Sequence, residues 1–151
     1  MTDQIERNIL VQAPLPRVWD MVTEPGWWVP SEVPAPAYRS IGAVTVRSSD
    51  KWGRFPVEVI AIDPMTYVAF RWASQFPGRD LTNGISTLIE FHLEEAPDGV
   101  RVSVVESGFD ALDSPEDVRQ AGFSDNSEGW ESELRSLAGR AAIAPERVSA
   151  R

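Results

Sequence analysis

The chain has 151 residues, about the length of one ordinary domain, with 14 basic and 23 acidic side chains and a net charge of −9. It has no cysteine and a single histidine, which excludes disulfides, thiolate metal sites and multi-histidine metal sites. The negative charge repels phosphate backbones, so we expect no nucleic-acid partner.

The first part of the chain predicts one strand followed by two short helices. Ile5–Val11 is rich in β-branched residues and ends just before two prolines, which a helix tolerates in its first turn. Apolar residues then recur at helical spacing: Leu15, Val18, Trp19 and Val22. Pro25-Gly26 ends this helix, Trp27-Trp28-Val29 forms a second apolar cluster, and a proline-rich loop follows over 30–36.

Five further runs of β-branched and aromatic residues predict a meander of strands. They are Ile41–Arg47, Phe55–Ile62, Tyr67–Trp72, Ile85–Leu93 and Val100–Ser107. Turn signals separate them, with a longer loop over 76–83. In the last two runs apolar residues alternate, which predicts one buried face. His92 has the opposite parity and should face solvent.

The C-terminal part predicts two helical pieces. Ser114-Pro115-Glu116-Asp117 has the cap, proline and acids of a helix start, and Gly122 should end that piece. A longer helix should begin near Asp125 and carry one apolar stripe. The stripe consists of Trp130, Leu134, Leu137 and Ala141. We therefore predict that this helix is buried against the sheet.

Together these elements predict an α+β domain in which a curved antiparallel sheet wraps round a long C-terminal helix, with two short helices after the first strand. A twisted sheet curling round a helix leaves space between them, where ligands bind. We expect one domain over residues 1–141 and a polar tail over 142–151.

Several fragments of the sequence, in their order and spacing, resemble a known superfamily. They are Val18-Trp19-Asp20 with Pro25-Gly26-Trp27-Trp28, Asp63-Pro64 with Phe70-Arg71-Trp72, the run 102–109, and Glu128-Gly129-Trp130 with Leu134. Over residues 1–141 the chain resembles the START-like (SRPBCC) proteins, and within them the activator of heat-shock-protein-90 ATPase homologue family. The resemblance implies a helix-grip fold with a ligand cavity between the sheet and the long helix.

The resemblance leaves three functions open, because members of the superfamily include lipid carriers, cyclase enzymes and co-chaperones. We favour a binding protein for a small hydrophobic or amphipathic ligand such as a lipid. A polyketide-cyclase-like enzyme using Glu106 as acid and base is one alternative, and a co-chaperone-type interaction module is another. Eukaryotic co-chaperone members carry an additional N-terminal domain, for which we expect no room in 151 residues, and this makes the co-chaperone alternative the less favoured one.

The remaining expectations concern partners and location. The sequence shows no cofactor motif and no metal-ligand cluster, so we expect neither group to be bound. No apolar run reaches the roughly 18 residues of a membrane span, and the N-terminus lacks a signal-sequence pattern. We therefore expect a cytoplasmic protein without membrane insertion. A homodimer is compatible with all of these patterns.

Glu106 is the most informative single residue, because it shares parity with Val102 and Val104 and should point inward. A buried carboxylate is costly unless it is paired. Glu106 could anchor a ligand or act as a general base; alternatively it could pair with an arginine or lie at an open mouth. The absence of a second inward acid makes it the only strong candidate for acid–base chemistry.

Eight aromatic residues are candidates for the wall of the ligand cavity, although aromatics more often simply pack a core. They are Trp27, Trp28, Phe55, Phe70, Trp72, Phe109, Phe123 and Trp130. Leu134 joins this set from the covering helix. Trp28 and Trp130 are the preferred pair, since one lies in a loop and the other on the helix.

Overall fold

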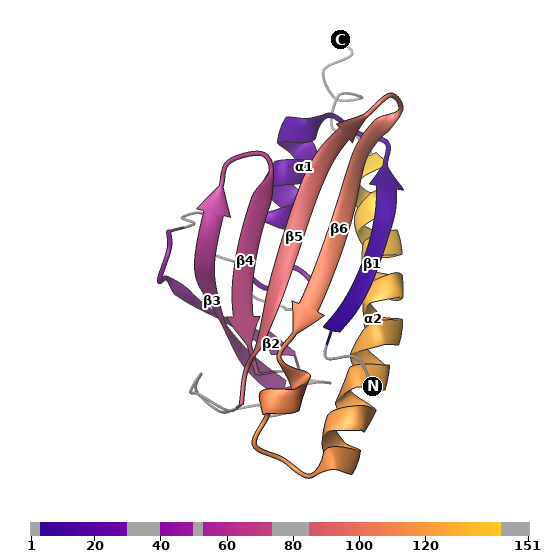
Figure 1. Cartoon of the computed structure of the whole chain (residues 1–151). Coiled ribbons are helices and arrows are strands. Elements are labelled where there is room, and N and C mark those ends of the chain that lie inside the picture. Colours follow the sequence, from indigo (N-terminus) through magenta and orange to yellow (C-terminus); the bar gives the residue numbers. More distant parts are fainter. Residues whose placement is uncertain (1–3, 30–39, 50–52, 74–84, 143–151) are drawn as a thin grey trace.

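The computed structural model describes residues 4–29, 40–49, 53–73 and 85–142. In this part of the chain six strands form one antiparallel sheet, in the order β1-β6-β5-β4-β3-β2. The strands are β1 (Gln4–Val11), β2 (Val44–Ser49), β3 (Gly53–Asp63), β4 (Tyr67–Trp72), β5 (Thr87–Ala96) and β6 (Gly99–Ser107). Each corresponds to a predicted strand, and the predicted α+β helix-grip fold is confirmed. Figure 1 shows both helices behind the sheet as drawn, with α2 running along β1.

Only one helix, α1 (Leu15–Val22), follows β1 within the described residues, where two were expected. Residues 23–29 form turns instead. The Thr23 hydroxyl donates to the Trp19 carbonyl at 2.7 Å, and Gly26 adopts a φ of 73°, which stops the helical path. The proline-rich loop over 30–36, the loop over 76–83 and the tail beyond residue 142 lie outside the described residues.

The C-terminal region forms one continuous helix, α2 (Glu116–Ala142), after a short 3₁₀ turn, η1 (Phe109–Ala111). The break predicted at Gly122 is wrong. A glycine inside a helix costs only about 1 kcal/mol relative to alanine. Burial of the apolar stripe farther along the same helix outweighs that cost.

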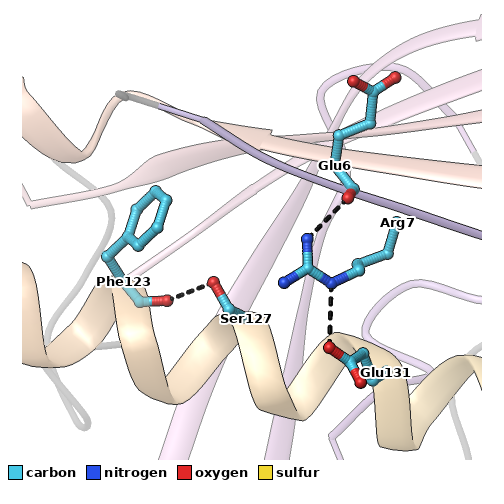
Figure 2. Close-up of polar contacts among 5 residues, drawn as sticks. All are labelled: Glu6, Arg7, Phe123, Ser127 and Glu131. Atoms are coloured by element: carbon cyan, nitrogen blue, oxygen red, sulfur yellow. Dashed lines mark hydrogen bonds and ion pairs between the residues drawn. The ribbon is translucent and has the colours of Figure 1, made fainter. Parts of the chain in front are cut away.

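Helix α2 is fixed to the sheet by its apolar stripe, as predicted. Trp130, Leu134, Leu137 and Ala141 are all buried. Polar contacts support this packing from β1: Arg7 Nε lies 3.2 Å from Glu131 Oε2, and Arg7 Nη1 donates to the Glu6 carbonyl (Figure 2). Both side chains are substantially exposed, so the ion pair contributes little and the apolar stripe decides the packing.

Candidate functional site

Glu106 on β6 lies at the centre of the interface between the sheet and α2. Its backbone pairs with Ile5 on one side and Ile89 on the other, and its side chain is completely buried. The alternation along β6 puts it on the same face as Val102 and Val104. The predicted inward orientation of Glu106 is therefore confirmed.

Four neutral side chains donate hydrogen bonds to the Glu106 carboxyl group. Its Oε2 accepts from Thr87 Oγ1 at 2.6 Å and from Trp72 Nε1 at 2.9 Å. Its Oε1 accepts from Trp130 Nε1 at 2.8 Å and from Asn126 Nδ2 at 3.1 Å. The donors come from β4, β5 and α2, so one carboxyl group ties three elements to β6.

These contacts replace the partners that were expected for Glu106. Glu106 is fully buried, so the interpretation that it lies at an open mouth is wrong, and no arginine among the described residues forms an ion pair with it. Burial raises the pKa of the Glu106 carboxyl above its ordinary value, while the hydrogen bonds from Thr87, Trp130, Trp72 and Asn126 act in the opposite direction. A ligand would have to displace one of these donors to reach the carboxyl oxygens.

The aromatic candidates separate into two groups of rings. Trp28 is central to the larger group, with ring centroids 5.4 Å from Phe70 and 5.5 Å from both Trp72 and Trp130. This tryptophan cluster contains Trp27, Trp28, Phe55, Phe70, Trp72, Phe91 and Trp130. The preferred pair, Trp28 and Trp130, is in direct contact.

Phe109 and Phe123 form a separate pair, with centroids 5.2 Å apart between η1 and α2. Phe109 is fully buried, whereas Phe123 is half-buried and packs against the core. In Figure 2 the Phe123 ring lies beside the helix, while its carbonyl accepts from Ser127 Oγ at 2.8 Å. Within the described residues this pair does not contact the rings of the tryptophan cluster. Leu134, the remaining candidate, lies on α2 and is buried in the core.

The four indole N–H groups of the tryptophan cluster have different partners. Those of Trp72 and Trp130 donate to Glu106. Those of Trp27 and Trp28 are buried and have no hydrogen-bond partner in the described part of the chain. Buried tryptophan N–H groups are normally satisfied, so two unpaired donors in one cluster require an explanation.

Sequence reasoning missed four residues of this region: Phe91, Thr87, Asn126 and Arg47. Three of them carried a usable signal. Phe91 and Thr87 share the inward parity of Ile89 on one strand. Asn126 precedes Trp130 by one helical turn. Arg47, a buried arginine on β2, gave no such signal, because simple alternation in Val44–Arg47 favours burial of the valines.

His92 lies on the outer face of β5 and is exposed, as predicted. Its ring centroid is 4.9 Å from that of Tyr67, whose hydroxyl donates to Glu90 at 2.6 Å. Burial and the neighbouring Glu90 carboxylate raise the pKa of Tyr67 to about 12. Among the described residues no group of three histidine, cysteine or acidic side chains could hold a metal ion. The absence of metal stays a prediction.

Residues 12–142 match the model of a family described as Activator of Hsp90 ATPase homolog 1-like protein. The chain belongs to this family. The predicted place in the SRPBCC superfamily is thereby confirmed. No curated protein matches the sequence.

Solved structures share the fold of this family member at low sequence identity. Protein MLL2253 from Mesorhizobium loti is 23% identical with a TM-score of 0.66, over 90% of this chain and 94% of that one. The Aha1 dimer from Colwellia psychrerythraea is 18% identical with a TM-score of 0.68, over 91% and 94%. DynU16, from the dynemicin biosynthetic locus, is 20% identical with a TM-score of 0.67, over 95% of this chain and 48% of that one. These likenesses establish the fold and not the function.

In the described part of the chain no helix is both long and apolar enough to cross a bilayer.

Proposed function

We propose that this protein binds a small apolar or amphipathic molecule at the tryptophan cluster, where the turn over residues 23–29 meets α2. The observation that carries the proposal is the pair of buried, unpaired indole N–H groups of Trp27 and Trp28. A ligand with a hydrogen-bond acceptor would satisfy them, and its apolar body would pack against the surrounding rings. Membership of a superfamily that includes lipid carriers supports the same function.

Binding is favoured over catalysis by the state of Glu106. A general base needs a lone pair aimed at the reacting atom, and an enzyme site needs several convergent polar groups. Both carboxyl oxygens of Glu106 instead accept hydrogen bonds from the protein's own side chains. The described residues therefore give the cyclase alternative no free acid or base inside the cluster.

The proposal can be tested with 9-fluorenone and fluorene, two flat tricyclic probes of the same shape. Only fluorenone has a carbonyl oxygen that can accept from an indole N–H. Isothermal titration calorimetry should show about tenfold tighter binding of fluorenone, since a buried donor left unpaired costs about 1–3 kcal/mol.

Two variants locate the site. Trp28→Phe keeps an aromatic ring and removes the N–H, so it should reduce the preference for fluorenone. Trp19→Phe is the matched control, because Trp19 is also buried but lies on α1 and its N–H is not among the unpaired donors. Failure of both probes to bind, or an equal effect of the two variants, would count against the proposed site.

A further inference from the structure

Strand β2 buries polar residues and exposes apolar ones, the reverse of an ordinary edge strand. Thr45 and Arg47 are 5% and 6% exposed, whereas Val44 and Val46 are 50% and 39% exposed. A slip of one residue in register would turn both valines inward and release the arginine to water. The observed register instead keeps a guanidinium in the interior, where burial of a charge is costly.

The Arg47 side chain lies against the turn that leads into the tryptophan cluster. Gly26 has a φ of 73°, and a Cβ at that position would overlap Arg47 Cγ. Across the sheet Arg47 is the register partner of Phe55, whose ring centroid is 5.6 Å from that of Trp72. Arg47 therefore lies between the turn carrying Trp27 and the strand carrying Phe55, at the border of the cluster.

The guanidinium of Arg47 is short of acceptors. Its Nη1 lies 3.3 Å from Oε2 of Glu24, an ion pair whose acidic partner is 40% exposed. Yet Nε and Nη1 are buried and make no hydrogen bond with any of the described residues. Nε–H and the Nη1 N–H groups lie on different edges of the planar guanidinium, so an anion would accept from Nε–H on one edge or replace the Glu24 carboxylate at Nη1 on the other, and the positive charge would strengthen either hydrogen bond.

We propose that the ligand is an amphipathic acid whose apolar body contacts the tryptophan cluster and whose carboxylate binds Arg47. This inference rests on the proposed function and specifies its ligand class. Without ligand, the Glu24 carboxylate pairs with Arg47 in place of the ligand carboxylate. The ligand displaces Glu24 from Arg47 when it binds.

The polarity of the interior supports this orientation of the ligand. Arg47 lies on the edge strand β2, while Glu106 lies on β6 with Phe55 and Trp72 on the strands between them. All four donors around Glu106 already donate to its carboxyl group, so a second carboxylate there would find no free donor. The end of the cluster at Arg47 offers positive charge and free donors.

The test uses 1-naphthaleneacetate and its neutral amide, 1-naphthaleneacetamide, which have nearly the same shape. Calorimetry near neutral pH should show that the wild-type protein binds the acid about tenfold more tightly than the amide. Arg47→Gln should remove this preference. Arg54→Gln is the matched control, because it removes the same charge from an exposed position on neighbouring β3 and should leave the preference unchanged.

Glu24→Gln gives an independent readout that does not depend on the stability of the Arg47 variant. Removing the competing carboxylate should raise the affinity for naphthaleneacetate several-fold and leave that for the amide unchanged. Equal binding of acid and amide, unaffected by Arg47→Gln or Glu24→Gln, would overturn the acid-binding role and leave the proposed function standing. Binding of fluorenone without naphthaleneacetate would do the same. If no probe binds, the proposed function itself fails, and Arg47 serves only its ion pair with Glu24.

Discussion

The four tryptophans of the tryptophan cluster form two pairs that differ in their hydrogen bonding, although all of them are buried or partly buried. The N–H groups of Trp72 and Trp130 both donate to Glu106 and close a hydrogen-bond network between sheet and helix. The N–H groups of Trp27 and Trp28 donate to none of the described residues, and Arg47 nearby also has buried N–H groups without a hydrogen bond there. In the first region every indole N–H group has a partner within the protein, whereas in the second region we propose that a ligand supplies the acceptor.

This difference shows that burial alone does not reveal a site. In the sequence Glu106 is a candidate site residue because a carboxylate on an inner face is unusual. In the structure, however, both of its oxygens accept hydrogen bonds from side chains of the protein. The unsatisfied groups lie at the other end of the same aromatic cluster. We therefore assign the Glu106 end to stability and the Arg47 end to binding, and the following predictions test that division.

The largest effect is expected from Glu106→Leu, which keeps the volume and removes every acceptor at the centre of the network. Four donors would lose their partner, so the free energy of unfolding should fall by at least about 3 kcal/mol. Urea denaturation followed by far-UV circular dichroism measures this loss. A change below about 1 kcal/mol would mean that the network contributes little to stability.

Leu134→Ala measures, for comparison, how much the free energy of unfolding falls when only apolar packing is lost. Leu134 is buried on α2 and makes only packing contacts, so its truncation should cost about 2–5 kcal/mol. The same denaturation experiment applies. An unchanged midpoint would contradict the packing of α2 on the sheet.

A smaller difference in stability is expected between substitutions of two buried threonines. Thr87→Val removes a donor to Glu106 without changing shape and should cost about 1–2 kcal/mol. Thr45→Val on β2 is the control, since the Thr45 hydroxyl donates to none of the described residues, and it should be neutral within about 0.5 kcal/mol. Thermal unfolding of the two variants measures the two losses of stability. Equal losses would contradict the assigned role of the Thr87 hydroxyl.

The smallest effect is a dependence of stability on pH. The folded-state pKa of Glu106 is raised above the ordinary value of 4.5, so the folded protein holds this proton more tightly than the unfolded chain. The stability advantage of wild type over Glu106→Leu should therefore be fully present below that ordinary value and decline as pH rises through the folded-state pKa. Denaturation midpoints of both proteins across acidic to neutral pH measure it. If the stability advantage of wild type instead grew with pH, the pKa of Glu106 would be lowered in the folded protein and not raised.

Much of this fold could be predicted because its elements follow simple periods. The alternation in Val100–Ser107 placed Glu106 inward, and the spacing of Trp130, Leu134 and Leu137 placed α2 on the sheet. The break expected at Gly122 failed because local helix propensity is weaker than tertiary packing. The inward turn of Arg47 could not be predicted, because the register of β2 reverses the hydrophobic pattern on which such reasoning depends.

The most direct test of the division between the two regions is the set of tryptophan indole signals in a ¹H–¹⁵N spectrum. Each of the six tryptophans gives its own N–H resonance, assignable by Trp→Phe variants. On addition of fluorenone the Trp27 and Trp28 signals should move downfield as they gain an acceptor, while those of Trp72 and Trp130 stay in place on Glu106. Movement of the Trp72 and Trp130 signals alone would contradict this account, because the ligand would then be using Glu106 and its donors.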